Sequence, residues 1–443
     1  MIKKQTWLII ALSVAILVRV GLWVNYPVAQ GNDTNTYQHL ANSIQNHQGF
    51  ERYNGTRTPG YPLFLMVTGS ESQAYLVQLW LGVLTSMLVY FIAWRLTNTH
   101  WLAGVLSLAH SLSLGQIFFE AALLSEAVSA FLFFLWLAGL LILLQHDKSP
   151  ENKLNTALHW ICAFGLGLAG TALAFTRPLF VFIPFLGAFF LLFFLQSSIK
   201  IRLGTAVLVV LPALASLALW VNFIHNKFNI WGLDTIGGYH LVTHAASFFE
   251  LVPDEYAPIR EIFLKFRAER IARTGSPANT IWDAIPELMG ETKLNYFALS
   301  RLMGSISRNL IVSHPFLYFQ NLILGWVWFW KVGVFWIPEQ VMNVNLRYVL
   351  DKIMFAQRML IFSFNMLFLG GTIALFSSWW RKISGMQAGL YAGLSAILTA
   401  SIVQAMAEHG DNARYLAPLQ TLVIVIVSVW VFNTYKNWKT NRA

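Results

Sequence analysis

The polar segment between the first two long apolar runs carries a carboxylate and a guanidinium that could act together. Asp33 precedes residues 37–44, whose apolar members share one helical face, a pattern typical of a helix lying flat on a bilayer surface. Arg57 follows directly before the Pro-Gly-Tyr-Pro run at 59–62, where two prolines and a glycine restrict the backbone to a tight turn. The segment therefore predicts an acid and a cation held at the same membrane–water boundary.

Further charged residues stand near the ends of later apolar runs, and they are Glu120, Glu126, Arg177, His409, Asp411 and Arg414. If these ends face one side of a membrane, loops far apart in sequence supply acids and cations to a single cleft. The interiors of the apolar runs hold almost no ionisable groups, whereas an ion-coupled transporter would be expected to keep some near the membrane midplane.

Chemistry at such a boundary suits a substrate that is half lipid. An isoprenoid phosphate would leave its charge at the surface, where arginines bind phosphate oxygens in bidentate, charge-assisted fashion. Arg57, Arg177 and Arg414 are the candidates for this contact. A carboxylate would then take the proton from an acceptor hydroxyl or amine as it attacks an anomeric carbon, while the lipid phosphate leaves.

The composition requires a membrane to position these residues. Of the 443 residues, 56% are hydrophobic and only 11% are charged, which is too little polar surface for a soluble globule of this size. We therefore predict an all-α, polytopic membrane protein. The net charge of +10 is interpreted as a topology signal and not as a nucleic-acid site.

Ten apolar runs are long enough to span a hydrocarbon core of about 30 Å, near 7–24, 74–96, 101–118, 121–145, 157–176, 179–195, 203–224, 356–377, 386–407 and 415–433. Basic residues at the N-terminus, at Arg95, in the 147–153 linker, at Lys200, at Arg381 and in the tail are expected on the cytoplasmic side. The chain thus divides into a membrane domain (1–224) with a catalytic first outer loop (25–73), a mostly helical outer-face domain (225–355) and C-terminal membrane helices (356–443).

The run 316–337 is also apolar but is packed with tryptophans. Counting it as one crossing would place the basic tail outside, so we predict an interfacial or re-entrant helix. Its tryptophans are interpreted as an aromatic belt and not as a sugar-binding platform.

Five short motifs occur in order along the chain: Asp33 before its helix, Arg57-Thr-Pro-Gly-Tyr-Pro62, Leu124-Ser-Glu126, Thr176-Arg-Pro178, and His409-Gly-Asp-Asn-Ala-Arg-Tyr415. In this respect the chain resembles the C-type membrane glycosyltransferases, in the branch with protein O-mannosyltransferases and the lipid A aminoarabinose transferase. The resemblance covers most of the chain except 225–355.

The resemblance implies a polyprenyl-phosphate-sugar donor, inversion at the anomeric carbon and Asp33 as catalytic base. Glu126 is a second catalytic candidate because of its position at the end of an apolar run. It also implies a glycan, lipid or protein acceptor and an active site on the outer face of the inner (plasma) membrane. The residues expected to bind the substrates are Arg57, Tyr61, Glu120, Arg177, His409, Arg414 and Tyr415.

One departure concerns a metal ion. Many relatives carry an acidic pair in the first loop, whereas here Asn32 and Thr34 flank Asp33. A divalent cation held by Asp33 with Glu120 or Glu126 stays open.

Structural roles also stay open for the candidate site residues. Asp33 could cap its helix, Glu126 could balance a nearby arginine, Arg57 and Arg177 could anchor at headgroups, and His409 could be an ordinary loop histidine. Two other functions remain as alternatives, an oligosaccharide ligase or polymerase with a diphosphate-linked donor, and a flippase for lipid-linked sugars.

Overall fold

The computed structural model describes residues 4–46, 49–146, 156–410 and 412–440, and over these ranges the chain is helical without a named strand. Eight of the described helices are long and apolar enough to cross a membrane, or up to ten if two bent pairs each count as one span. The predicted all-α, polytopic membrane fold is confirmed. Seven of the long helices are α1 (Lys4–Asn25), α4 (Glu71–Thr97), α7 (Glu126–His146), α8 (Thr156–Thr176), α10 (Ile199–Phe228), α16 (Val344–Ala374) and α18 (Ala388–Ala407). The eighth is η6 (Asn412–Leu419) continued by α19 (Gln420–Thr440).

Two predicted spans are not single long helices. The run near 101–118 forms α5 (His100–Ser111) and α6 (Leu114–Ala121), which are bent by 53°. The run near 179–195 forms the short η2 (Pro178–Phe180) and α9 (Ile183–Phe194). Hydropathy measures only the length of an apolar run, so it does not detect the break between α5 and α6.

The tryptophan-rich run is helical over only part of its length. Helix α15 (Pro315–Phe329) follows α14 (Tyr296–Ser313) at an angle of 106°, because Pro315 cannot continue the hydrogen-bond ladder of α14. Beyond α15 the chain is non-helical up to Ile337, and Phe335 and Trp336 pack beside Tyr26 and Phe118. The helix is therefore shorter than predicted, and its placement relative to a bilayer stays a prediction.

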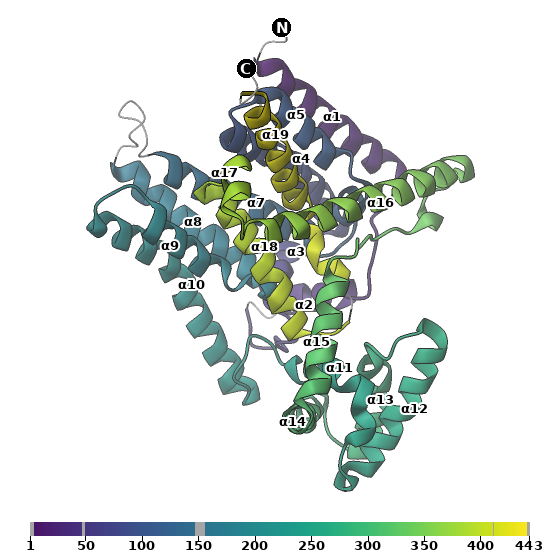
Figure 1. Cartoon of the computed structure of the whole chain (residues 1–443). Coiled ribbons are helices and arrows are strands. Elements are labelled where there is room, and N and C mark those ends of the chain that lie inside the picture. The colour runs from purple at the N-terminus through teal and green to yellow at the C-terminus, as the bar shows by residue number, and fades with distance from the viewer. Residues whose placement is uncertain (1–3, 47–48, 147–155, 411, 441–443) are drawn as a thin grey trace.

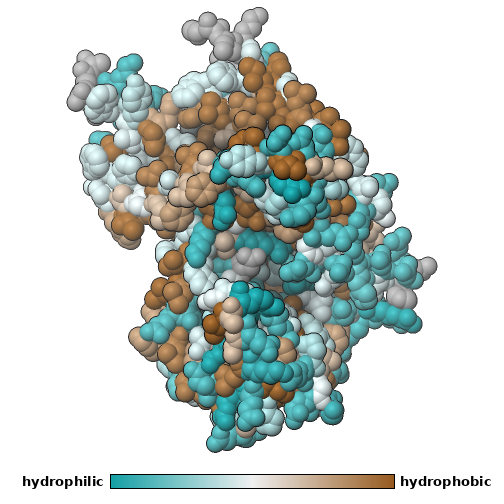
Figure 2. Space-filling view, turned by 90° about the vertical axis from the view of Figure 1, so that its right-hand side faces the viewer, coloured by the Kyte–Doolittle hydropathy of each residue, from teal (hydrophilic) through white to brown (hydrophobic). Residues whose placement is uncertain are grey.

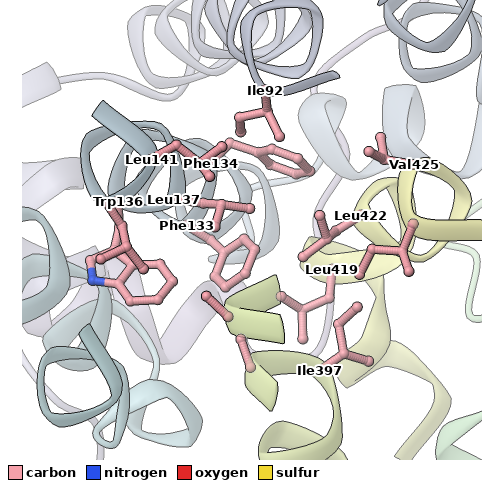
Figure 3. Packing of buried hydrophobic residues seen from close by; sticks show 14 of the residues in the cluster. Ile92, Phe133, Phe134, Trp136, Leu137, Leu141, Ile397, Leu419, Leu422 and Val425 are labelled. Carbon is pink, nitrogen blue, oxygen red and sulfur yellow. The ribbon is translucent and has the colours of Figure 1, made fainter. Parts of the chain in front are cut away.

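The membrane core forms around α7. Phe133, Trp136 and Leu137 of this helix converge with Ile92 of α4 and Leu422 of α19 in one buried cluster (Figure 3). Burial of this apolar surface and the close packing of its side chains stabilise the contact between helices that are distant in sequence. Because α7 begins at Glu126, this core fixes the position of that carboxylate.

The segment predicted as the outer-face domain, residues 225–355, is called the outer domain below, and it has a hydrophobic core of its own. Helices α11 (Gly237–Ala245), α12 (Ala257–Thr274), α13 (Thr280–Thr292) and α14 pack around a separate apolar cluster that includes Tyr239 and Phe263. Figure 1 shows this domain at the end of the molecule opposite both termini. Hydrophobic residues cover much of the part nearest the termini, whereas hydrophilic residues are more frequent over the outer domain (Figure 2).

The first loop forms helices α2 (Thr34–Asn46) and α3 (Gly60–Thr68), which lie between the membrane helices and the outer domain (Figure 1). Tyr37 and Ala41 pack against Tyr61, while Leu40 and Ile44 pack near Trp220. The predicted helix is present, but its apolar face is buried in the protein and does not lie on lipid. An amphipathic pattern is equally compatible with a helix that packs on the bilayer and with one that packs on other helices.

The outer domain is tied to this loop by backbone contacts. The Thr235 N–H donates to the carbonyl oxygen of Gly55 at 2.9 Å, and its hydroxyl donates to that of Asn54 at 3.2 Å. The first loop and the start of the outer domain therefore form one continuous wall beside Arg57.

Several topology markers lie outside the described residues. They are Lys3, the 147–153 linker, Asp411 and the end of the C-terminal tail.

Candidate functional site

Asp33 lies between two guanidinium groups. Its Oδ1 accepts a hydrogen bond from Arg57 Nη2 at 2.7 Å, and its Oδ2 accepts one from Arg414 Nη1 at 2.7 Å. Both carboxylate oxygens are thus engaged by arginine, and the side chain remains 25% exposed. Burial by itself would raise the pKa of Asp33, but the charges of Arg57 and Arg414 outweigh burial and hold the pKa below its ordinary value. Asp33 is therefore an ionised acceptor at neutral pH.

Glu126 joins two arginines behind Asp33. It is the first residue of α7 and almost fully buried, and its Oε1 accepts a hydrogen bond from Arg414 Nε. The Nη1 atom of Arg177 lies 3.3 Å from the same oxygen. A buried carboxylate needs such partners, so Glu126 holds Arg177 and Arg414 in position, which is the structural role left open above.

Tyr415 connects this group to a second carboxylate. The guanidinium of Arg177 lies over the Tyr415 ring, 4.3 Å from its centroid, and the Tyr415 hydroxyl donates to Glu408 Oε2 at 2.8 Å. The Nδ1 atom of His240 lies 3.6 Å from the same oxygen. Burial would raise the pKa of Glu408, but His240 and the tyrosine hydrogen bond lower it to about 2.

These side chains surround a cavity of about 340 Å³. Among its lining residues are five of the predicted site residues, Asp33, Arg57, Arg177, Arg414 and Tyr415, together with Tyr37, Asp234, His240 and Glu408. The first loop, α8, the outer domain, α18 and η6 each contribute at least one of them. The cavity therefore joins carboxylates, guanidiniums and sugar-sized space in one place.

Four predicted site residues lie outside this lining, and they are Glu126, described above, with Tyr61, His409 and Glu120. Tyr61 is fully buried and donates to Gln78 Oε1 at 2.8 Å. His409 stacks on Trp328 with 4.8 Å between ring centroids, its backbone N–H donates to Thr243, and burial lowers its pKa. Tyr61 and His409 thus support the walls of the cavity without lining it.

Glu120 is the fourth, and it forms a buried ion pair elsewhere. Its two oxygens accept from Arg19 Nε at 2.9 Å and Nη2 at 2.7 Å. A Cβ added to Gly82 would lie 2.2 Å from Glu120 Oε2, so α4 approaches the pair closely. The sequence shows an acid near the end of an apolar run, but the helix register that places Arg19 opposite it is not visible there.

We expect Glu120→Ala to lower the free energy of unfolding by about 3–5 kcal/mol, because it leaves Arg19 buried without a counter-charge. Thermal unfolding in detergent measures this. The double variant Arg19→Met/Glu120→Leu should lose less stability than the single variant, and Glu291→Ala on exposed α13 should change little. A double variant less stable than Glu120→Ala would contradict this interpretation of the pair.

Two charged residues of the cavity lining, Glu408 and His240, were not predicted from the sequence. Glu408 stands one position before the last motif, at the end of an apolar run, which is a signal that could have identified it. His240 lies in α11 of the outer domain, a region without a recognised motif, so the sequence offered no comparable signal.

The donor set argues against a shared cation. Arg414 takes one oxygen each of Asp33 and Glu126, and Arg19 takes both oxygens of Glu120. Within the described residues no group of three or more His, Cys, Asp or Glu side chains could hold a metal ion. The carboxylates considered for a metal are engaged by guanidiniums instead.

Comparison with known proteins was informative only at the level of structure. No protein-family model matches the chain, and no curated protein matches its sequence. The archaeal oligosaccharyltransferase AglB from Archaeoglobus fulgidus, in complex with an inhibitory peptide and a dolichol-phosphate, matches with a TM-score of 0.52 at 15% identity, covering 99% of this chain and 51% of that one. The apo form of the Archaeoglobus fulgidus oligosaccharyltransferase gives 0.50 at 14% identity, with 99% and 52% covered.

ArnT from Cupriavidus metallidurans, bound to undecaprenyl phosphate, gives a TM-score of 0.35 at 14% identity, with 96% and 78% covered. The chain spans about half the length of the two oligosaccharyltransferase chains. The likeness to those chains shows that this protein has the C-type fold that the motifs predicted.

Proposed function

We propose that this protein is a membrane glycosyltransferase that moves a sugar from a polyprenyl-phosphate carrier to a glycan, lipid or protein acceptor. The observation that carries the proposal is Asp33 held between Arg57 and Arg414 at the wall of a cavity. The neighbours in fold are oligosaccharyltransferases, one of them with bound dolichol-phosphate. Both termini lie at the end of the molecule opposite the outer domain (Figure 1). Because the basic residues near the termini are expected on the cytoplasmic side, we infer that the cavity opens on the outer side of the membrane.

The arginines suit a phosphodiester. Arg57 Nε and Arg177 Nη1 are buried, and neither forms a hydrogen bond to another described residue, although Arg177 Nη1 lies 3.3 Å from Glu126 Oε1 as an ion pair. Both residues line the cavity. Buried donors of this kind are seldom left without an acceptor, and a phosphate oxygen forms short, charge-assisted bonds with guanidinium groups. Arg57, Arg177 and Arg414 therefore bind the donor phosphate in this mechanism.

Asp33 then acts as the base. When Arg57 turns to the phosphate, the carboxylate loses one of its ion pairs and its proton affinity rises. The acceptor O–H or N–H gives its proton to Asp33 while its electron pair forms the new bond to the anomeric carbon. The bond from that carbon to the phosphate oxygen breaks, and its electrons leave with polyprenyl phosphate. Attack opposite the leaving phosphate inverts the anomeric carbon.

An apolar groove next to the cavity suits the lipid chain. It has a volume of about 730 Å³ and lies between α3, α7, α8 and α10. Thr176 lines both the groove and the cavity, and it directly precedes Arg177. A chain in this groove would leave its phosphate beside the arginines. The groove is lined by Phe64, Val128, Leu132, Phe175, Leu219, Trp220 and others.

Filling this groove should weaken only long-chain donors. We expect Ala172→Trp to raise KM for a long polyprenyl-phosphate sugar by roughly 10-fold, as overpacking of about 1–3 kcal/mol implies, and to leave KM for a donor with a very short chain unchanged. Steady-state kinetics in detergent measures both. Val207→Trp, on the exposed face of α10 away from the groove, is the matched control. Equal effects on both donors would place the lipid elsewhere.

The direct test of the proposed function uses purified protein with radiolabelled polyprenyl-phosphate sugars in host membrane extract. We expect free polyprenyl phosphate and a labelled acceptor to form together. Consumption of diphosphate-linked donors alone would favour a ligase or polymerase. Passage of the labelled donor across a vesicle membrane without release of the carrier would favour a flippase. Either result would overturn the proposal.

A further inference from the structure

We propose that Glu408, with His240 beside it, binds the hydroxyl groups of the sugar that is transferred. This inference rests on the proposed function and assigns the part of the cavity that the phosphate and the base do not occupy. Asp33, Arg57, Arg177 and Arg414 supply the base and the phosphate contacts. Asp234, His240 and Glu408 are the remaining carboxylate and imidazole residues of the lining.

The position of Glu408 suits a group attached to the phosphate. Arg177 lies over one side of the Tyr415 ring, and the hydroxyl of that ring bonds to Glu408. The carboxylate is therefore one tyrosine side chain away from a phosphate-binding arginine. A sugar is joined to its carrier phosphate through the anomeric carbon, so its ring must lie within this short distance of Arg177.

The chemistry of Glu408 suits hydroxyl donors. Oε2 already serves Tyr415 and His240, but none of the described residues donates a hydrogen bond to Oε1. The carboxylate is ionised at neutral pH, and an ionised carboxylate accepts strong hydrogen bonds at both oxygens. Glu408 can thus receive a sugar hydroxyl while it keeps its protein partners.

His240 supplies a donor of the opposite kind. Its ring lines the cavity, and its pKa lies above the usual value because Glu408 outweighs the effect of burial. It packs edge-on against Trp282 at 5.6 Å between centroids, which fixes the ring. An imidazole N–H and a carboxylate side by side offer a donor and an acceptor to neighbouring hydroxyls.

A purely structural role is the competing explanation, since the Glu408–His240 contact also joins the outer domain to the last loop. A structural role and a sugar-binding role predict different effects on ligand binding. A structural contact supports the whole cavity, including the phosphate site, whereas a sugar contact is absent when the ligand is the carrier phosphate without sugar. The comparison of these two ligands separates them.

The experiment measures KM for the sugar donor and the inhibition constant of sugar-free polyprenyl phosphate. Glu408→Gln keeps an oxygen that can accept from Tyr415, so the fold is expected to survive. We expect KM to rise about 10- to 100-fold, the loss of a hydrogen bond to a charged group, with the inhibition constant changed less than 2-fold. His240→Gln should act in the same direction, and Glu261→Gln on the exposed face of α12 should change neither constant.

A second readout varies the donor as well as the protein. Donors lacking one sugar hydroxyl should be poorer substrates of the natural protein, and for the hydroxyl that Glu408 binds, Glu408→Gln should have no further effect. If both constants rise alike, or if no deoxy donor removes the effect of the variant, the subsite is refuted while the transferase stands. If the natural protein consumes no donor, the proposed function itself fails.

Discussion

Asp33→Asn should lower turnover by about 10²- to 10⁴-fold, the usual contribution of a positioned general base, while donor binding stays within a few-fold of the natural protein. The amide keeps the size of the carboxylate and an oxygen that can accept from one arginine, but it cannot take a proton from the acceptor. Because the arginines that bind phosphate are unchanged, loss of turnover should appear in kcat and not in the affinity for donor.

Single-turnover release of polyprenyl phosphate gives the chemical step, and binding of labelled donor gives the affinity. Glu51→Gln changes the same charge on an exposed residue of the same loop and should retain full activity. Turnover by Asp33→Asn equal to that of Glu51→Gln would show that Asp33 serves only to hold its two arginines.

Arg414→Met should damage both folding and activity. Arg414 is the one described side chain that hydrogen-bonds to both Asp33 and Glu126. Its removal leaves Glu126, which is 1% exposed, with Arg177 as its only described ion-pair partner. We expect the free energy of unfolding to fall by about 3–5 kcal/mol, and donor turnover to be lost.

Thermal unfolding in detergent with and without a second substitution tests the cause. Arg414→Met/Glu126→Gln should recover part of the lost stability, since Glu126 then no longer carries a buried charge that Arg177 alone must balance, but it should not recover turnover. Arg308→Met on the exposed face of α14 is the matched control and should unfold like the natural protein. A double variant less stable than Arg414→Met would mean that Arg414 acts through packing and not through charge.

The parts of the site that sequence could predict are those with local signals. Asp33, Arg57, Arg177, Arg414 and Tyr415 stand in short motifs at the ends of apolar runs, and the topology brings all five to the cavity. Their chemical roles stay predictions. Most of the long membrane helices followed from hydropathy because length and apolarity are local properties, whereas the bend between α5 and α6 and the shortness of α9 did not.

The parts that escaped prediction depend on which helix faces which. The pairing of Glu120 with Arg19 needs the register between α1 and α6, and the burial of α2 needs the position of α10 beneath it. His240 reaches the cavity only because the outer domain is tied to the first loop at Thr235. Each of these three contacts depends on tertiary packing between distant segments, which cannot be deduced from a short stretch of sequence.

Gly60 shows how two of the motifs became one unit. A Cβ at this position would lie 2.5 Å from the backbone of Phe175 and Thr176, so the first loop rests directly on the end of α8. Any side chain at position 60 would push the turn after Arg57 away from the helix end before Arg177. The spacing between these two arginines is thus set by the absence of a single methyl group, although most of the membrane domain separates them along the chain.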